Sequence, residues 1–205
     1  MRIIFATNNA HKVEEIQAAI GNSLEIITLR QAGIDIDIPE PHDTLEANAT
    51  EKSTTIHKLT GGAHCFSEDT GLEVAALDGE PGVKSARYAG EDRAFEKNIG
   101  KLLNNLAGQP DRSARFRTVI SLIWNGKEYF FEGICNGRIL PAPTGEGGFG
   151  YDPVFVPEGE TRSFAQMSLE EKNRYSHRRK AADQLVAFLQ SAVPSTDSTA
   201  PQTSN

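Results

Sequence analysis

The stretch with the clearest chemical potential is residues 67–71, which holds two adjacent carboxylates, two hydroxyl groups and a glycine. Apolar residues on either side predict that one strand ends at residue 66 and that another begins at residue 72. A rigid strand end can aim Asp69 at a metal ion or a water molecule. Gly71 permits a positive φ or the close approach of a ligand to the backbone. The alternative is a polar turn held by a hydrogen bond from Asp69.

A second polar stretch, residues 7–12, follows an apolar run that predicts a buried strand. Apolar residues at helical spacing between positions 13 and 20 predict a helix, with Glu14 and Glu15 on its other face. The polar stretch therefore lies at a helix N-terminus, where free N–H groups and the helix dipole favour an anion, and Lys12 adds positive charge. The alternative is an ordinary capping loop.

Glu40 lies between two prolines, which fix an extended segment and present this carboxylate. The alternative is a surface linker with a solvated Glu40. A helix is predicted from Thr44, which can cap it, to about Leu59. Within this helix Asn48 and Lys52 share a face, because they are four residues apart. Such a pair alone is also typical of a solvated helix face.

Residues 145–153 form a glycine-rich loop with a formal GxGxxG pattern. We reject a dinucleotide-binding fingerprint, because an extended run at 153–156 follows where that motif must open a helix. The glycines let a backbone approach a flat ligand, and Phe149 could stack on a base. A tight β-connection with core aromatics is the alternative.

Basic residues gather at two predicted helix starts near the C-terminus. A capping box at 168–171 opens a helix that carries Lys172. The last helix begins at Ser176, with His177 and Arg178 in its first turn. Positive charge there opposes the helix dipole, so an anionic or electron-rich partner is expected. The alternative is a basic surface patch.

The other predicted elements are a strand at 24–29, a helix at 93–106 and a hairpin. The hairpin joins runs 116–124 and 127–134 through Asn125-Gly126, a pair typical of a type I′ turn.

The composition is typical of a soluble globular protein, with 205 residues, 38% hydrophobic and 24% charged. A net charge of −7 argues against general nucleic-acid binding, although a small anion needs only a local basic cluster. Cys65 and Cys135 lack CxxC partners and are expected to be reduced, buried thiols. No apolar run is long enough to span a bilayer and no signal peptide is evident, so we expect a cytoplasmic protein without membrane partners. Residues 191–205, rich in Ser, Thr and Pro, are predicted to be a disordered tail after one domain at 1–190.

Six motifs in order resemble the inosine triphosphate pyrophosphatase family, also called XTP/dITP diphosphatases, over about residues 1–190. Each motif is weak alone. They are Thr7-Asn8-Asn9-x-x-Lys12, Glu46-x-Asn48 with Lys52, Ser67-Glu68-Asp69-Thr70-Gly71-Leu72, Pro81-Gly82-x-x-Ser85-Ala86-Arg87-Tyr88, Gly148-Phe149-Gly150-Tyr151-Asp152-Pro153 and Ser176-His177-Arg178. The family often has Asp-Asp-Ser-Gly where this chain has residues 68–71, and both changes keep the functional group.

The resemblance implies an α/β fold with a long mixed β-sheet flanked by helices, two lobes and a central substrate cleft, usually in a homodimer. It also implies Mg²⁺-dependent hydrolysis of noncanonical purine nucleoside triphosphates (ITP, dITP, XTP) to the monophosphate and pyrophosphate, which cleanses the nucleotide pool. Asp69 matches the catalytic acidic residue, and Glu40 with Asp69 the metal ligands. The expected substrate-binding residues are Thr7, Asn8, Asn9, Ala10, His11, Lys12, Lys52, Thr70, Phe149, Gly150, Tyr151, Asp152, Lys172, His177 and Arg178.

The residues agree with this resemblance. The cations needed by a triphosphate are available in Lys12, Lys52, Lys172 and Arg178. Carboxylates suit Mg²⁺, and Asp69 could be a metal ligand or accept a proton from water. Arg178 can only donate, so we expect it to favour a 6-oxo purine over adenine. The rival functions are a Maf-type nucleotide pyrophosphatase with another base preference and a nucleotide sensor that does not hydrolyse its ligand.

Overall fold

The computed structural model describes residues 2–192. Three single-turn 3₁₀ helices cover Ala75–Leu77 (η1), Ser85–Arg87 (η2) and Phe164–Gln166 (η3). The α-helices are α1 (Ala10–Ile20), α2 (Leu45–Leu59), α3 (Phe95–Asn105), α4 (Leu169–Asn173) and α5 (His177–Ala192). The strands are β1 (Arg2–Phe5), β2 (Glu25–Thr28), β3 (Cys65–Val74), β4 (Pro81–Gly82), β5 (Ser113–Trp124), β6 (Lys127–Ile139) and β7 (Phe155–Pro157).

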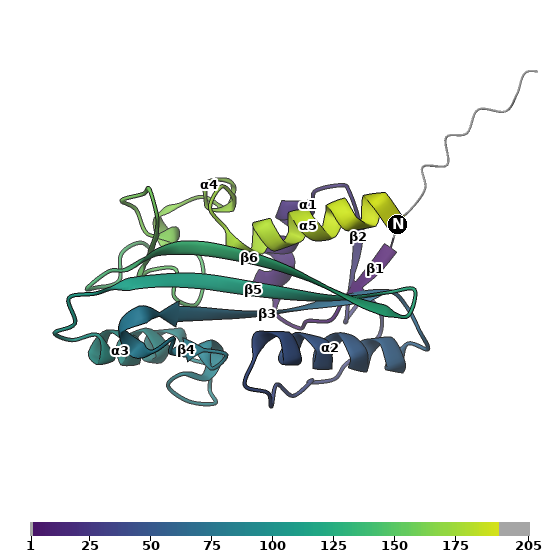
Figure 1. The fold of residues 1–205 in the computed structure, drawn as a ribbon, viewed down its shortest axis with the longest axis horizontal. Coiled ribbons are helices and arrows are strands. Elements are labelled where there is room, and N and C mark those ends of the chain that lie inside the picture. Colours follow the sequence, from purple (N-terminus) through teal and green to yellow (C-terminus); the bar gives the residue numbers. More distant parts are fainter. Residues whose placement is uncertain (1, 193–205) are drawn as a thin grey trace, which may run out of the picture.

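The strands form a mixed seven-stranded sheet in the order β2-β1-β3-β5-β6-β7, with β4 paired to β3. β1 is parallel to β2 and β3, and the other pairs are antiparallel. The long strands β3, β5 and β6 run the length of the molecule (Figure 1). This arrangement confirms the predicted long mixed sheet flanked by helices.

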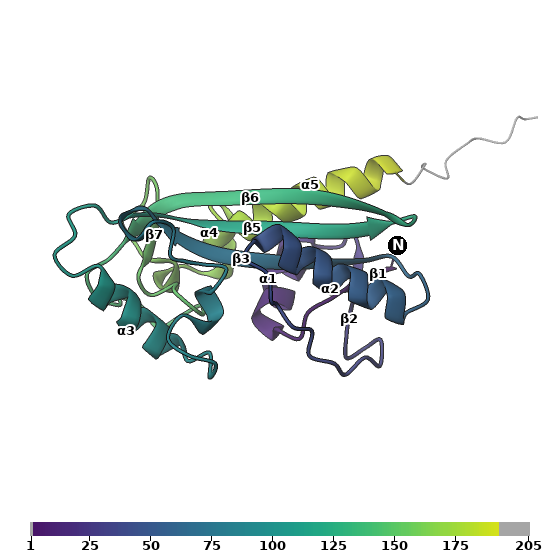
Figure 2. The same ribbon diagram turned by 60° about the horizontal axis from the view of Figure 1, so that its bottom comes forward.

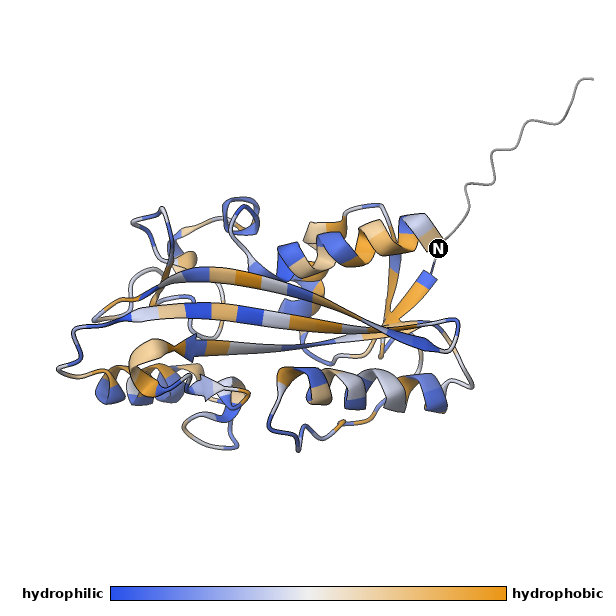
Figure 3. Ribbon diagram, viewed as in Figure 1, coloured by the Kyte–Doolittle hydropathy of each residue, from blue (hydrophilic) through white to orange (hydrophobic). Residues whose placement is uncertain are grey.

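Helices cover both faces of the long strands. Leu122 of β5 packs in one core cluster with Leu185 of α5. Its neighbour Ser121, which points to the opposite face, hydrogen-bonds Ser53 of α2 at 2.7 Å. Along β5, hydrophilic and hydrophobic residues alternate in the first half of the strand, whereas the second half is mostly hydrophobic and buried (Figure 3). Because successive side chains of a strand point to opposite faces, α5 and α2 lie on opposite sides of the sheet.

The core is divided into clusters at the two ends of the long strands, which gives the two predicted lobes. The cluster near the N-terminus includes Phe5 of β1, Ile16 of α1 and Leu185 of α5. The cluster at the other end includes Leu102 of α3 and Phe155 of β7. Figure 2 shows α2 and α3 along opposite ends of β3.

The acidic stretch is part of one continuous strand, so the predicted strand–turn–strand arrangement at 65–75 is wrong. β3 pairs with β5 along its whole length, from Cys65–Ile123 to Val74–Ala114. On its other edge, β1 pairs with β3 at 65–66 and β4 pairs with it at 72–73. Residues 67–71 lie between these partners at the edge that borders the cleft. Backbone hydrogen bonds to β5 keep this polar stretch extended, although its composition alone favours a turn.

Several local predictions are confirmed. Asn125 and Gly126 have φ values of +50° and +72°, as a type I′ turn between β5 and β6 requires. Thr44 caps α2 by accepting a hydrogen bond from the backbone N–H of Ala47 at 3.2 Å. β7 follows the glycine-rich loop, as the rejection of a dinucleotide fingerprint required.

The predicted tail lies mostly outside the described residues. α5 continues to Ala192, so Ser191 and Ala192 belong to this helix, and residues 193–205 are not described. Both cysteines are buried, as predicted, and burial raises the pKa of each thiol to about 12. Within residues 2–192, no helix has the length and apolar character needed to cross a membrane.

Candidate active site

One cavity of about 410 Å³ gathers almost all the predicted site residues. The exceptions are Ala10 and His11, which form the start of α1 beside it. The predicted residues in its lining are Thr7, Asn8, Asn9, Lys12, Glu40, Lys52, Asp69, Thr70, Phe149, Gly150, Tyr151, Asp152, Lys172, His177 and Arg178. Residues from seven separate stretches of the chain therefore meet at the free edge of β3.

The carboxylates of Asp69 and Glu40 converge on Lys52 of α2. The Lys52 Nζ donates to Asp69 Oδ1 at 3.0 Å and to Glu40 Oε1 at 2.6 Å. The amide of Asn48, one helical turn earlier, donates to Asp69 Oδ2 at 3.4 Å. Arg87 of η2 donates to Glu40 Oε2 at 3.1 Å. The shared face of Asn48 and Lys52 thus belongs to the site, and Glu40 is not merely solvated.

Burial and charge act differently on these two carboxylates. Burial raises the pKa of Asp69, although Lys52 and Lys12 oppose this effect. Burial would also raise the pKa of Glu40, but Lys52, Lys12 and Arg87 outweigh it and lower the pKa to about 2. Asp69 is therefore the carboxylate whose environment better suits accepting a proton.

The pair Glu40 and Asp69 fits a divalent cation that keeps water and phosphate ligands. Their oxygens already converge on one positive charge, the ammonium of Lys52, at 2.6 and 3.0 Å. Mg²⁺ in phosphate-binding sites needs only one or two carboxylates, with water and substrate phosphates completing its shell. Among residues 2–192 no group of three or more His, Cys, Asp or Glu side chains forms a ready-made metal site. The donor set therefore suits a metal that arrives with its substrate.

Glu68 points to the other face of β3, where it binds Arg178 of α5. Arg178 Nε donates to Glu68 Oε2 at 2.6 Å and its Nη2 donates to Glu68 Oε1 at 3.1 Å. Lys12 Nζ lies 2.9 Å from Glu68 Oε1. Burial would raise the pKa of Glu68, but Arg178 and Lys12 outweigh it and hold that pKa far below its usual range. The anionic partner expected for the first turn of this helix is thus confirmed.

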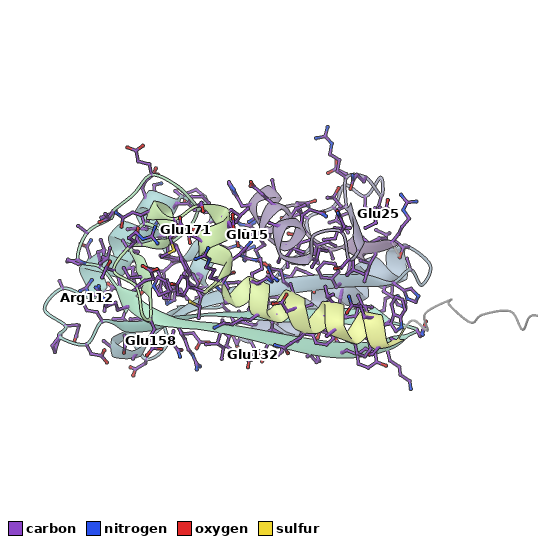
Figure 4. All side chains as sticks on the ribbon, turned by 90° about the horizontal axis from the view of Figure 1, so that it is seen from above. Glu15, Glu25, Arg112, Glu132, Glu158 and Glu171 are labelled. Carbon is purple, nitrogen blue, oxygen red and sulfur yellow. The ribbon has the colours of Figure 1, made fainter. Side chains whose placement is uncertain are left out.

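Glu15, predicted on the face of α1 away from its apolar residues, is buried there between Arg178 and Lys172. Its Oε1 accepts from Lys172 Nζ at 2.6 Å, and its Oε2 accepts from Arg178 Nη1. Glu15 is only 5% exposed. Figure 4 shows Glu15 beside the N-terminal end of α5. The Glu15 carboxylate therefore orients two cationic side chains that lie more than 150 residues away in the sequence.

The glycine-rich loop holds Asp152 and Phe149. Asp152 accepts from Lys172 Nζ at 2.5 Å and from the backbone N–H of Phe149 at 2.9 Å. Gly148 has φ +74°, and a Cβ there would lie 2.2 Å from Asp152 Oδ2. The ring of Phe149 is stacked on that of His11, with centroids 5.0 Å apart, and Lys172 Nζ lies 5.1 Å from its centroid. The glycine lets the loop fold back so that a carboxylate and an aromatic ring both reach the cavity.

His177 is neutral, contrary to its predicted role as a positive charge. Complete burial, together with Arg178 and Lys172, lowers its pKa well below 6.5. Its ring stacks on Phe116, with centroids 4.7 Å apart. Within the described part of the chain, its Nδ1 is a buried atom with no hydrogen-bond partner. The ring thus offers the cavity an uncharged imidazole.

The cations of the site are already neutralised by its own acidic side chains. The four residues expected to bind phosphate, Lys12, Lys52, Lys172 and Arg178, are all paired. Their partners are Glu15, Glu40, Glu68, Asp69 and Asp152. A triphosphate entering this cavity would need additional positive charge, which a divalent ion can supply.

Comparison with known proteins identifies the family of this chain. The profile of the Ham1 family matches residues 3–188. The chain belongs to the Ham1 family. A Porphyromonas gingivalis protein named dITP/XTP pyrophosphatase is 52% identical over 189 residues, which cover 92% of this chain and 97% of that protein. A Flavobacterium johnsoniae protein of the same name is 47% identical over 189 residues, covering 92% and 98%.

Solved structures of Ham1 proteins share the fold. The Staphylococcus aureus Ham1 protein has a TM-score of 0.84 at 39% identity and covers 94% of this chain and 100% of its own. The Coxiella burnetii HAM1 protein has a TM-score of 0.84 at 35% identity, covering 93% and 99%. The predicted family and fold are thereby confirmed.

Sequence reasoning missed several residues that shape this Ham1 site. Arg93 and Phe95 line the cavity, and the Phe95 ring lies 6.3 Å from that of Phe149. Gly133 of β6 allows α5 to begin directly on the sheet, since a Cβ there would lie 1.9 Å from the His177 carbonyl oxygen. Gly71 also serves a close approach, but to the backbone of Gly82, whose oxygen would lie 2.7 Å from an added Cβ. Gly133 lies in the run 127–134, which was predicted to be a strand, and a glycine within a strand was the available signal of a close approach. Gly71 was predicted to permit a close approach, but of a ligand and between two strands.

Proposed function

We propose that this Ham1 protein hydrolyses noncanonical purine nucleoside triphosphates such as dITP, ITP and XTP to the monophosphate and pyrophosphate. The observation that carries the proposal is the convergence of Glu40, Asp69 and Lys52 at one edge of a cavity whose other side holds aromatic and cationic groups. Its curated relatives named dITP/XTP pyrophosphatase, at up to 52% identity over most of the chain, support the same substrate class.

Asp69 is proposed as the catalytic carboxylate and, with Glu40, as a metal ligand. A divalent ion, which we propose is Mg²⁺, would supply charge neutralisation for the phosphates when bound. Lys52, which contacts both carboxylates, is proposed to bind a phosphate oxygen of the substrate. The neutralised cations of the site support this need for a divalent ion.

The proposed reaction is an attack of water on the α-phosphorus. The water proton passes to an Asp69 carboxylate oxygen as the new P–O bond forms. The bond from the α-phosphorus to the bridging oxygen then breaks, and pyrophosphate leaves with that oxygen. The raised pKa of Asp69, caused mainly by burial, supports its role as the proton acceptor.

The opposite side of the cavity is proposed to bind the base and sugar. Phe149 offers a ring for stacking, and Tyr151, Asp152 and Lys172 form the wall beside it. We propose that the remaining predicted positions, at 7–12 and at Gly150, enclose the substrate between these walls. The closeness of His11 to Phe149 supports a place for this loop at the mouth of the base site.

Base choice is proposed to depend on Arg178. Its guanidinium has five N–H groups, but most of them are already bonded within the protein. Glu68 takes two N–H groups, Glu15 takes one, and Thr70 Oγ1 accepts another from Nη2 at 3.4 Å. One N–H on Nη1 is therefore left for a ligand. The oxygen of a 6-oxo purine can accept a hydrogen bond from this N–H. The 6-amino group of adenine is itself a donor, so it would face the N–H without forming a hydrogen bond.

We further propose that the protein acts as one catalytic domain in a cytoplasmic homodimer without nucleic-acid or membrane partners. The match of the family profile to residues 3–188 supports a single domain. Light scattering of the purified protein would show whether it is a dimer.

The proposed function is tested by measuring pyrophosphate release from ITP, XTP, dTTP and ATP, with and without Mg²⁺. We expect kcat/KM for ITP and XTP to exceed that for ATP and dTTP, and activity to need the divalent ion. A preference for dTTP would indicate a pyrophosphatase of another base specificity. Tight ITP binding without release would indicate a nucleotide sensor.

A further inference from the structure

A buried hydroxyl group lies directly behind the cavity wall. Thr118 of β5 is the register partner of Thr70 of β3. Thr118 is fully buried, and its Oγ1 lies 2.6 Å from Oγ1 of Thr70. Thr70 lines the cavity, whereas Thr118 does not. The two hydroxyls thus form a relay from the sheet interior to the substrate side.

The positions of the hydroxyl hydrogens follow from the acceptors available. Among the described residues, Thr70 Oγ1 is the hydrogen-bond partner found for the Thr118 hydroxyl. If Thr70 donated to Thr118, the Thr118 hydrogen would be buried without an acceptor, which is unfavourable. Thr118 is therefore the donor of this pair.

Thr70 Oγ1 also receives an N–H from Arg178 Nη2 at 3.4 Å. A hydroxyl oxygen has two acceptor sites, so these two donors occupy both. The hydrogen of Thr70 must then point away from Thr118 and Arg178. Because Thr70 lines the cavity, its hydrogen is available to a ligand there.

We propose that Thr118 is a positioning residue that fixes the Thr70 hydroxyl as a donor to an acceptor oxygen of the nucleotide substrate. Phosphate, ribose and 6-oxo purine groups all carry such oxygens. The inference rests on the proposed function, because it assumes that the cavity holds this substrate. Thr118 acts through Thr70 and does not touch the substrate itself.

The substitution Thr118→Val tests the proposal, since it removes the hydroxyl and nearly keeps the side-chain shape. We expect kcat/KM for ITP to fall about three- to tenfold, the range for one hydrogen bond. Thr118→Ser keeps the hydroxyl and should restore activity to within about twofold. The same losses should appear in the equilibrium binding of ITP with Mg²⁺, measured by calorimetry in the Asp69→Asn background so that ITP is not turned over.

The decisive comparison is a double-mutant cycle with Thr70→Val. Because Thr118 acts only through the Thr70 hydroxyl, Thr118→Val should have no further effect on kcat/KM or on binding in that background. Equal losses in both backgrounds, or unchanged values for Thr118→Val alone, would overturn the proposal.

A matched control is Ser121→Ala on the same strand. Ser121 makes a buried hydroxyl pair with Ser53 at 2.7 Å, on the face away from the base side of the cavity. Its loss should affect the melting temperature but not kcat/KM. If wild-type protein binds ITP without hydrolysing it, the proposed function fails, while the binding cycle still decides the role of Thr118.

Discussion

Glu68 and Asp69 are neighbours in the sequence, but their carboxylates lie on opposite faces of β3 and bind different cations. Asp69 accepts from Lys52 at 3.0 Å, and Glu68 accepts from Arg178 at 2.6 Å. The alternation of a strand separates the two carboxylates, and the free edge of β3 lets both faces border one cavity. One strand thereby divides a proposed catalytic side from a proposed base-binding side.

Asp69→Asn is expected to reduce turnover of ITP by about a hundredfold or more, because a proton acceptor and metal ligand is lost. The matched control is Glu73→Gln, which changes a carboxylate on the same face of β3 that pairs with Arg115 away from the cavity. Circular dichroism and steady-state kinetics check both variants. Near-normal turnover of folded Asp69→Asn would remove this residue from the mechanism.

Glu15→Gln should destabilise the protein by about 3 kcal/mol, because it leaves Arg178 and Lys172 without a shared buried counter-charge. The ITP-to-ATP ratio of kcat/KM should also narrow, since Arg178 is no longer held on that side. Urea unfolding and kinetics measure the two effects. Glu14→Gln on the exposed face of α1 is the control and should change neither. Equal behaviour of the two variants would mean that the buried ion pairs do not shape the site.

Arg178→Lys keeps the positive charge but cannot hold Glu68 through two parallel N–H bonds. We expect kcat/KM for ITP to fall more than that for ATP, by about tenfold if one base contact is lost. An equal loss with both substrates would show that Arg178 serves the phosphates or the fold.

Gly133→Ala should shift the first turn of α5, because the new Cβ would lie 1.9 Å from the His177 carbonyl oxygen. Both the melting temperature and kcat/KM for ITP should fall. Gly100→Ala in α3 is the matched control, because its Cβ meets nothing within 4 Å and alanine favours a helix by about 1 kcal/mol. Normal activity in Gly133→Ala would show that the helix start tolerates displacement.

His177 should make stability depend on pH below its ordinary pKa of 6.5, because burial lowers its pKa in the folded protein. Between the two pKa values the unfolded chain binds the extra proton, so stability falls with decreasing pH by up to about 1.4 kcal/mol per unit. His177→Phe should flatten the change in unfolding free energy between pH 7.5 and 5.5. The exposed His42→Gln variant is the control. If the unfolding free energy of His177→Phe depends on pH as steeply as that of the wild-type protein, other titratable groups cause this dependence.

The sequence supported prediction where local pattern and chemistry coincided. The hairpin at Asn125-Gly126 and the cap at Thr44 depend on neighbouring residues alone, and both are confirmed. The meeting of Glu40, Asp69 and Lys52 was expected from the family resemblance, although the continuous strand that positions Asp69 was not.

The rest depended on contacts between distant segments. Glu15 belongs to a polar pattern that looks the same whether its carboxylate meets water or two buried cations. The partnership of Thr118 with Thr70 follows from the register of β3 against β5, which no local pattern specifies. Gly133 matters only because α5 crosses it, 44 residues further along the chain.

The central claim is that this cavity cleaves a 6-oxo purine triphosphate by attack of water on the α-phosphorus. Hydrolysis of ITP in ¹⁸O-labelled water, followed by mass spectrometry of the products, tests it most directly. The account predicts IMP carrying one ¹⁸O atom and unlabelled pyrophosphate. Labelled pyrophosphate, or release of IDP with inorganic phosphate, would contradict it.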